Sequence, residues 1–472
     1  MNLLSKSLLA TSILLATAAY ASDVSATTHA TIIINNAQIL PMDGKTQIIE
    51  NGTIVIQGNQ IVAVGDAKVA QGYSAERVID ASGKIVMPGM VNGHTHIGMT
   101  AFRGLGESGV ENRLKQVMFP LEKEMLDRQL IRTASRQAAM EMALSGTTMI
   151  ADMYYHQDEV AKAVAEVGIR GVMGETVIGF PVVDAKQPYG GLEYAEQFIK
   201  EWQGHELIVP AVAPHAPYTV SAEFLVKSKQ LADKYDVPLL THLAEFRWEE
   251  AGVRKFSKQM SEEQSVIEYL DSLDVLGDNL VAAHMNYLDE HDMDLVKQHN
   301  VGVVHCPKSN LKGANGQSPA WMMHSKGIDL GIGTDGPMSS NQNDVLTVMS
   351  YTAMNARTLH KDNSKFSPYE LLELATIGGA RALNMQDEIG SLEVGKKADI
   401  VIFETDSPNM QPNYDPFSTI AFSAYPQNVE YTIVNGKVIV EDGQLMTVDM
   451  AEHNQEWKKV TDKVGNFAKT LK

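Results

Sequence analysis

The sequence predicts an α/β protein in which an eight-stranded (β/α)8 or TIM barrel is joined to a composite β-sandwich made from both ends of the chain. Two observations predict this fold. Through the middle of the chain, apolar strand-like runs alternate with amphipathic helical runs. At both ends, short β-rich runs are broken by Gly, Asn and Asp turns. We expect the β-sandwich at 22–84 and 391–447, the barrel at 85–390 and a helix at 448–472.

Residues 1–21 are expected to form a secretory signal peptide. Lys6 supplies a positive charge, residues 8–18 are largely apolar, and Ala19-Tyr20-Ala21 fits a small-residue cleavage site. The apolar stretch is shorter than the roughly 20 residues that a membrane span needs. The sequence therefore predicts a periplasmic or secreted protein with no membrane attachment after cleavage.

The barrel strands are expected where short apolar runs recur between helical stretches. The runs begin near Ile85 and continue at 147–153, 171–177, 207–213, 238–241, 280–283, 302–305 and 329–333. Helical stretches such as 128–144 and 222–235 separate them. Eight strands alternating with helices are the number that closes a parallel barrel of this kind.

Composition and charge limit the classes of function. With 44% apolar and 21% charged residues, the chain has the composition of a globular protein. Its net charge of −19 comes without a block of Lys and Arg, which argues against nucleic acid as a partner. The single cysteine, Cys306, excludes an intramolecular disulfide. We expect a small heterocyclic molecule as the substrate and leave a homo-oligomer open.

His94 and His96 flank one threonine directly after an apolar run, and they are the most informative feature of the sequence. Side chains two apart on a strand point to the same face, so both imidazoles can reach one cation at the end of the strand. Imidazole suits zinc and other first-row metals. A pair of exposed loop histidines is the alternative interpretation of this motif when it is taken alone.

Three further segments end strand-like runs in a residue that can bind metal or carry a proton. His242 is followed by Glu245 three residues later, His284 ends a second run, and Asp335 ends a third. Each of these residues taken singly is typical of a turn after a strand. Because the carboxyl ends of parallel barrel strands meet at one mouth, we expect all four side chains to lie beside the first histidine pair.

The ordered motifs resemble the amidohydrolase superfamily, and within it the S-adenosylhomocysteine/methylthioadenosine deaminases and s-triazine hydrolases. The resemblance covers essentially the whole mature chain and includes Pro88-Gly89-Met90-Val91-Asn92-Gly93-His94-Thr95-His96, Pro214-His215-Ala216-Pro217-Tyr218, His242-Leu243-Ala244-Glu245, Cys306-Pro307-Lys308-Ser309-Asn310 and Gly333-Thr334-Asp335-Gly336. It implies one divalent metal, zinc with iron and manganese as alternatives, held by His94, His96, His242 and Asp335. His215 stands where two-metal relatives have a bridging lysine, which implies a mononuclear site.

The residue types also support hydrolysis. A water bound to zinc has a pKa of roughly 7 instead of 15.7, so hydroxide is available at neutral pH. Asp335 can take a proton from that water, Glu245 can carry a proton to a ring nitrogen, and His284 can hydrogen-bond the attacking oxygen. The sequence therefore predicts Glu245, His284 and Asp335 as catalytic residues.

His215, Glu175 and Arg103 are the expected substrate-binding residues. The resemblance implies this role for His215 and places Arg103 in one of the shared motifs. Glu175 falls near the position where the family has an arginine for the tail of its substrate. If Glu175 faces the pocket, a carboxylate-tailed substrate meets like charge, so we expect a neutral or cationic substrate.

The expected function is hydrolytic deamination of an amino-substituted N-heterocycle, such as an adenosine derivative, by metal-bound hydroxide with release of ammonia. Removal of chloride or alkylamine from a triazine, or hydrolysis of a cyclic amide, would use the same residues and stays open. A non-catalytic binding module is the remaining alternative. Such relatives usually lose ligands, whereas all six metal and proton-transfer residues are present here.

Overall fold

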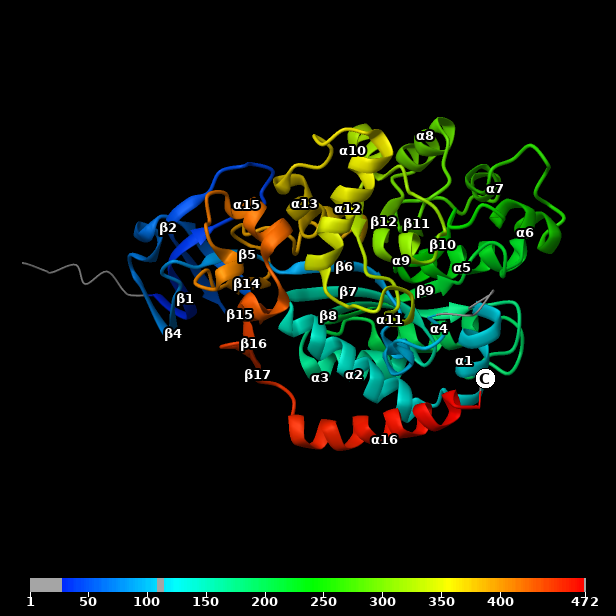
Figure 1. The fold of residues 1–472 in the computed structure, drawn as a ribbon, viewed down its shortest axis with the longest axis horizontal. Helices are drawn as coiled ribbons and strands as arrows, with labels where there is room; N and C mark the ends of the chain where they lie inside the picture. The colour runs from blue at the N-terminus through cyan, green and yellow to red at the C-terminus, as the bar shows by residue number, and fades with distance from the viewer. Residues whose placement is uncertain (1–27, 108–113, 471–472) are drawn as a thin grey trace, which may run out of the picture.

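The computed structural model describes residues 28–107 and 114–470, so the expected signal peptide lies outside the described residues. Two bodies lie side by side (Figure 1). One is a barrel of strands surrounded by helices, and the other is a β-sheet domain that contains strands from both ends of the chain. The last long helix, α16 (Met450–Ala468), runs along the underside of the barrel.

The barrel consists of eight parallel strands in sequential order. They are β6 (Met90–Thr95), β7 (Thr147–Tyr154), β8 (Arg170–Val177), β9 (Ile208–Pro214), β10 (Leu239–Leu243), β11 (Leu280–His284), β12 (Gly302–His305) and β13 (Leu330–Ile332). The two end strands meet: the Asp335 amide, just after β13, donates to the His94 carbonyl on β6 at 3.0 Å. The predicted eight-stranded parallel barrel is confirmed.

Helices follow the barrel strands and cover their outer faces. The main ones are α2 (Arg128–Leu144), α3 (Gln157–Val167), α4 (Gly191–Trp202), α5 (Ala222–Tyr235), α6 (Glu249–Phe256), α7 (Val266–Ser272), α8 (Glu290–Gln298), α10 (Ala320–Lys326), α12 (Val345–His360), α13 (Pro368–Leu374) and α14 (Ile377–Ala382). Several of these helices begin at a polar N-cap residue: the side chains of Asp127, Ser265 and Asp289 cap α2, α7 and α8. Shorter helices α1 (Phe119–Met125), α9 (Pro307–Lys312), α11 (Pro337–Ser340) and α15 (Pro416–Ser418) lie in the connections.

The interior of the barrel is filled by small and β-branched side chains. Val91, Ala151, Val172, Ala213 and Val304, each from a different strand, belong to one buried cluster. Strands that are buried on both faces are rich in such residues, because helices cover the outside while the interior packs on itself. The barrel is therefore closed at its centre, and a site must lie at one of its ends.

The second body is a nine-stranded sheet to which both ends of the chain contribute. Its strands are β1 (Thr28–Ile39), β2 (Ile49–Gln57), β3 (Gln60–Gly65), β4 (Tyr73–Asp80), β5 (Ile85–Pro88), β14 (Ile400–Phe403), β15 (Val429–Val434), β16 (Lys437–Glu441) and β17 (Gln444–Leu445). The antiparallel pair β5 and β14 joins the two ends, with Val86 opposite Ile402. Side chains from both ends share one buried apolar cluster, including Ile32, Ile54 and Ile433.

The position predicted for the first barrel strand is wrong. The run at Ile85–Pro88 pairs with β1 and β14 in the second sheet, and the first barrel strand, Met90–Thr95, begins two residues later. Gly89 lies between the two sheets, where an added Cβ would meet the Thr148 side chain at 2.1 Å. Both short runs are completely buried, and hydrophobicity alone does not tell which sheet a buried run joins.

A buried ion pair fastens the barrel to the second sheet. Arg170 at the start of β8 donates from Nε to Asp399 Oδ2 at 2.7 Å and from Nη2 to Asn435 Oδ1 at 2.6 Å. Both members of the pair are almost inaccessible to solvent. Removing one member of such a pair leaves an uncompensated buried charge, which costs about 3–5 kcal/mol.

We therefore expect Asp399→Ala to lower the free energy of unfolding by about 3–5 kcal/mol in a urea titration. The exposed pair Lys458–Asp462 on α16 supplies the control, since Asp462→Ala should cost at most about 1 kcal/mol. Equal losses in the two variants would contradict the role given to Asp399.

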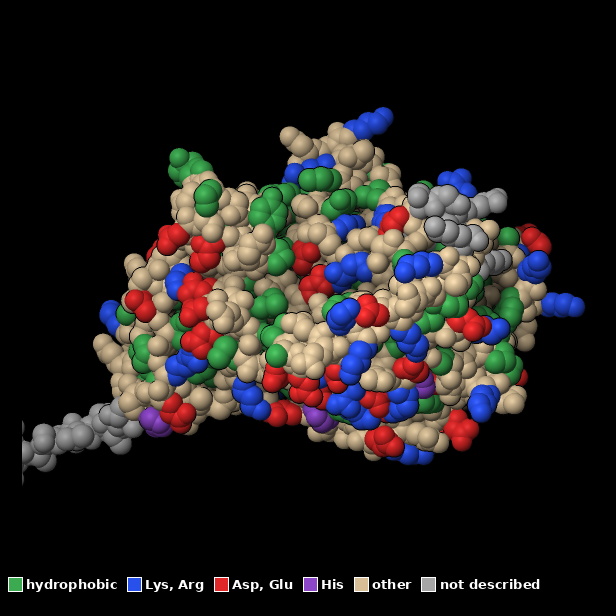
Figure 2. Space-filling model, turned by 60° about the horizontal axis from the view of Figure 1, so that its bottom comes forward, with side chains coloured by type: hydrophobic (Ala, Val, Ile, Leu, Met, Phe, Trp, Pro, Cys, Tyr) green, Lys and Arg blue, Asp and Glu red, His purple; other side chains and the backbone are tan. Residues whose placement is uncertain are grey.

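Helix α16 docks on the barrel through its apolar side and through ion pairs. Val460 and Val464 join the buried cluster of α2 and α3, and Glu456 pairs with Arg136. Over this underside, Lys and Arg side chains lie among Asp and Glu side chains (Figure 2). In the described part of the chain, we find no helix with the length and apolar composition needed to cross a bilayer.

Candidate metal centre and active site

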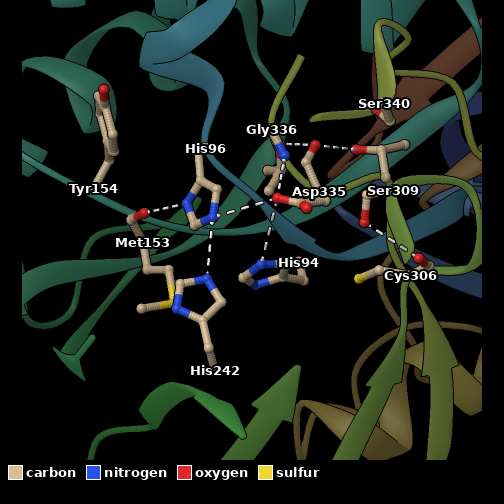
Figure 3. Close-up of polar contacts among 12 residues, drawn as sticks. His94, His96, Met153, Tyr154, His242, Cys306, Ser309, Asp335, Gly336 and Ser340 are labelled. Carbon is tan, nitrogen blue, oxygen red and sulfur yellow. Dashed lines mark hydrogen bonds and ion pairs between the residues drawn. The ribbon is translucent and has the colours of Figure 1, made fainter. Parts of the chain in front are cut away.

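Three histidines meet at the carboxyl end of the barrel strands. His94 lies on β6, His96 directly follows β6, and His242 lies on β10. Their ligating nitrogens all lie within 4.8 Å of one another. Figure 3 shows the three imidazoles and the Asp335 carboxylate pointing toward a common centre. The sequence motif and the strand ends thus bring together the residues predicted to bind metal.

Backbone carbonyls orient two of the imidazoles. His96 Nδ1 donates to the Met153 carbonyl at 2.5 Å, and His242 Nδ1 donates to the His215 carbonyl at 2.7 Å. A proton held on Nδ1 leaves the lone pair of Nε2 free, and the two Nε2 atoms face each other at 3.2 Å. Burial holds the pKa of His94 and His242 well below the ordinary range, so both rings are neutral and can act as ligands.

Asp335 supplies the fourth donor. Its Oδ1 lies 3.4 Å from His96 Nε2 and 3.9 Å from His94 Nε2. The residue has a left-handed backbone with φ of 60°, and the Gly336 amide donates to Oδ1 at 2.5 Å. A non-glycine residue in this conformation stores strain, which is typical of positions that a functional site fixes.

The donor set fits a divalent metal. The buried His94 Nε2 has no hydrogen-bond partner among the described residues, and a ligand nitrogen requires that state. Three imidazoles and one carboxylate are the ligand types of a zinc site. His94, His96, His242 and Asp335 would therefore hold the metal.

Glu245 and His284 lie beside this centre. His284 Nε2 is 3.8 Å from Glu245 Oε2, and the Asn315 side chain donates to Glu245 Oε1 at 3.0 Å. His284 Nδ1 donates to Asn310 Oδ1 at 2.9 Å, which leaves Nε2 as the acceptor nitrogen. Burial raises the pKa of Glu245 well above its usual range, and the Asp335 carboxylate adds to the shift. A carboxyl in this position can take up a proton and give it to a substrate.

A closed network of side chains fixes Glu245 and His284. Asn310 donates to Asn286 at 2.7 Å, and Asn286 donates to the Glu245 carbonyl at 2.9 Å. Glu249 accepts the Glu245 amide at 2.7 Å. Of these residues, the sequence motifs included only Asn310. The other two lie in loop and helix positions where polar residues are common, so the sequence carries no signal for them.

A pocket opens next to the metal centre. Its wall includes His96, His215 and His242, the apolar side chains of Met99, Met118, Phe119, Met153, Tyr154 and Tyr155, and the polar residues Glu122 and Thr176. Tyr154 donates to Glu122 Oε1 at 2.8 Å, and burial raises the pKa of Glu122 to about 7. Glu122 is a pocket residue that sequence reasoning missed.

His215 lies where the sequence predicts it, in the wall of this pocket. Its Nδ1 is hydrogen-bonded to the Thr219 hydroxyl at 2.9 Å, so the ring is held in one orientation. Burial lowers the pKa of His215 to about 3, and the ring is therefore neutral. A neutral, oriented imidazole can exchange a hydrogen bond with a bound molecule through its second nitrogen.

The structure corrects two predicted substrate-binding residues. Glu175 lies on the outer face of β8: its neighbour Thr176 lines the pocket, whereas the Glu175 carboxylate accepts the Gln157 amide of α3 at 3.1 Å. Arg103 makes a bidentate pair with Glu141 on α2, at 3.1 and 2.6 Å, instead of lining the pocket. Side chains alternate between the two faces of a strand, which places Glu175 on the face opposite Thr176. The guanidinium of Arg103 is held by its two hydrogen bonds to the Glu141 carboxylate.

Comparison with known proteins agrees with this geometry. Residues 85–439 match the model of the amidohydrolase family. The chain belongs to the amidohydrolase family. It is a hydrolase that acts on C–N bonds, and the predicted family is confirmed.

Relatives of the amidohydrolase resemble it over nearly their whole length. The 5-methylthioadenosine/S-adenosylhomocysteine deaminase of Thermodesulfovibrio yellowstonii is 35% identical over 427 residues, which cover 89% of this chain and 96% of that protein. The protein of the same name from Symbiobacterium thermophilum is 37% identical over 87% of this chain and 94% of its own.

Solved structures match the fold. A zinc-bound adenosine deaminase from Xanthomonas campestris superposes with a TM-score of 0.89 and 30% identity, covering 93% of this chain and 99% of its own. Atrazine chlorohydrolase from Arthrobacter aurescens, also with zinc, has a TM-score of 0.84 and 22% identity, covering 91% of this chain and 100% of its own. At that identity the second likeness supports the fold alone.

Proposed function

We propose that this amidohydrolase removes the exocyclic amino group of an adenine nucleoside whose 5′ substituent is uncharged, such as 5-methylthioadenosine or adenosine itself. The observation that carries the proposal is the buried Glu245 carboxyl, 3.8 Å from His284 Nε2 and beside the cluster of His94, His96 and His242. The names of the full-length relatives point to the same class of substrate.

The side chains divide the reaction between them. When bound, a divalent metal supplies Lewis acidity that makes water acidic enough to attack at neutral pH. His284 accepts a hydrogen bond from the attacking water, and Asp335 accepts its proton. Glu245 gives a proton to the ring nitrogen next to the amino-bearing carbon, which makes that carbon electrophilic. Return of a proton to the amino group then releases ammonia and leaves the oxo product.

The pocket favours an apolar substituent over a charged one. The described residues that line it include three methionines, a phenylalanine and two tyrosines, and no Lys or Arg. Against these described residues, an amino-acid tail such as that of S-adenosylhomocysteine would lose its hydration without gaining a partner for its carboxylate. The expected preference for a neutral substrate therefore rests on the apolar wall, because Glu175 lies outside the pocket.

The test is a comparison of kcat/KM values for the zinc-loaded enzyme, with ammonia release as the readout. We expect 5-methylthioadenosine and adenosine to exceed S-adenosylhomocysteine by at least about tenfold, because a buried polar group without a partner costs about 1–3 kcal/mol and a charged one costs more. Chloride release from atrazine, or turnover of a cyclic amide in the absence of nucleoside deamination, would replace the proposal with the corresponding hydrolase.

Glu122 offers a prediction about the sugar. It is the carboxyl group of the pocket wall, and Tyr154 occupies only one of its acceptor positions. We expect Glu122→Gln to raise KM for adenosine by about 2- to 10-fold, the value of one hydrogen bond, while KM for free adenine changes little. Equal changes for adenosine and adenine would mean that Glu122 does not contact the sugar.

We also propose that the enzyme is exported. The proposal rests on the charged start, apolar core and small-residue cleavage site in residues 1–21. We expect the mature protein, beginning near Ser22, in the periplasmic or secreted fraction, as checked by N-terminal sequencing. An uncleaved protein in the cytoplasmic fraction would contradict export.

A further inference from the structure

A second group of buried polar side chains lies on the face of β8 opposite the pocket. Glu175 is fully buried there, and its Oε2 accepts the Gln157 amide at 3.1 Å. Asp184 comes from the segment between β8 and α4, and its Oδ2 accepts the His156 amide at 2.6 Å. His156 and Gln157 are consecutive at the start of α3, so one helix end holds both carboxyl groups side by side.

The two carboxyl groups accept consecutive backbone amides and lie close enough for the Asp184 carboxyl to raise the pKa of Glu175. The remaining oxygens, Glu175 Oε1 and Asp184 Oδ1, are buried and have no N–H or O–H partner among the described residues. Two ionised carboxylates side by side repel, and a proton on one of them would remove the repulsion and supply a donor to the other. Burial raises the pKa of Glu175 well above its usual range, and the charge of Asp184 raises it further.

The other charged and titratable groups around the pair lie on three helices and at one strand end. They are Arg128 on α2, His156, Asp158 and Glu159 at the start of α3, Tyr194 on α4, and Tyr155 after β7. Arg128 is already paired with Asp158 and Glu159. Burial lowers the pKa of His156, so this neutral ring leaves the charge of the carboxyl pair uncompensated.

We propose that Glu175 and Asp184 share one proton and act as positioning residues that hold the segment 178–190 against the wall of the substrate pocket. This segment reaches the pocket in two places. The Phe180 ring packs on Phe119 with centroids 5.9 Å apart, and Val182 and Val183 pack on the apolar cluster that includes Tyr155. Phe119 and Tyr155 both line the pocket.

The sign of the pH effect follows from the shared proton. While the pair is protonated, Asp184 is bound to Glu175 and the segment is held. As pH rises and the pair loses this proton, two adjacent carboxylates repel and the segment is released. Loss of this proton changes the pocket wall and leaves the metal ligands in place. We therefore expect KM to change more than kcat.

The kinetic test rests on the proposed function for its substrate. From neutral to alkaline pH, we expect KM of the wild-type enzyme for adenosine to rise by about 2- to 10-fold, the value of one hydrogen bond. In Glu175→Gln the amide donates to Asp184 at every pH, so the ratio of wild-type KM to variant KM should rise by this factor between neutral and alkaline pH. Glu122 titrates in both proteins, so its effect on KM cancels when the wild-type KM is divided by the variant KM at each pH. A parallel rise in Glu175→Gln would overturn the proposal.

A second test needs no substrate, so its failure is distinguishable from failure of the proposed function. Beside the bands of other buried carboxyl groups such as Glu245 and Glu122, infrared spectra at neutral pH should show a protonated-carboxyl band that both Glu175→Gln and Asp184→Asn abolish, because either amide supplies the donor and leaves one ionised carboxylate. Glu159→Gln, which changes an ion-paired carboxylate nearby, should keep the band. Persistence of the band in Asp184→Asn, or a second stoichiometric cation lost with Glu175→Gln, would overturn the proposal.

Discussion

Glu245→Gln is expected to keep a full complement of metal and to lose about 10²- to 10⁴-fold in kcat, the contribution of a positioned proton carrier. The amide has nearly the same shape and still accepts the Asn315 side chain at Oε1, so the pocket should remain intact. It cannot give a proton to the ring nitrogen. KM should therefore change little compared with kcat, and metal analysis beside steady-state kinetics separates the two effects.

Glu250→Gln is the matched control, because Glu250 lies on the adjacent helix α6 and pairs with Arg254 at the surface. This variant should retain the kcat of the wild-type enzyme. Unchanged turnover in Glu245→Gln would remove Glu245 from the mechanism, and loss of metal together with turnover would make it a structural support of the metal centre instead.

The fold could be predicted from the sequence because the barrel repeats one simple pattern. Each strand is a short apolar run followed by an amphipathic helix, and the count of eight closes the barrel. The first strand was misplaced because Ile85–Pro88 and Met90–Thr95 are both fully buried and separated by one glycine. Pairing with β1 and with β14, the latter more than 300 residues later, distinguishes the two runs, and pairing between distant segments leaves no local pattern.

The metal-binding and proton-transfer residues could be predicted because they lie at or just after the ends of strands, and the barrel brings these strand ends together. The orientation of Glu175 could not be predicted, because β8 is buried on both faces and its sequence shows no alternation of polar and apolar residues. An added Cβ at Gly174 would contact Ala213 in the barrel interior, whereas Met173 packs among the side chains of α2 and α3. Because residues two apart share a face of the strand, Thr176 faces the pocket like Gly174, and Glu175 faces outward like Met173.

Replacing both His94 and His96 with alanine is expected to abolish stoichiometric metal binding and to lower kcat by about 10³-fold or more, since a Lewis-acid metal contributes several kcal/mol to the transition state. The two rings are half of the four-ligand set, and both are aimed at the centre from β6. His242 and Asp335 alone leave too few donors for a tight zinc site. Metal content after dialysis and kcat for adenosine are the measurements.

His305→Ala provides the comparison, because His305 is a buried histidine at the end of β12 that lies outside the metal-binding group. We expect this variant to lose stability through the cavity left by the ring but to keep its metal. Zinc should restore the chelator-treated wild-type enzyme and the His305 variant, and should not restore the double variant. Full activity of a metal-loaded His94/His96 double variant would mean that the reaction does not use this centre.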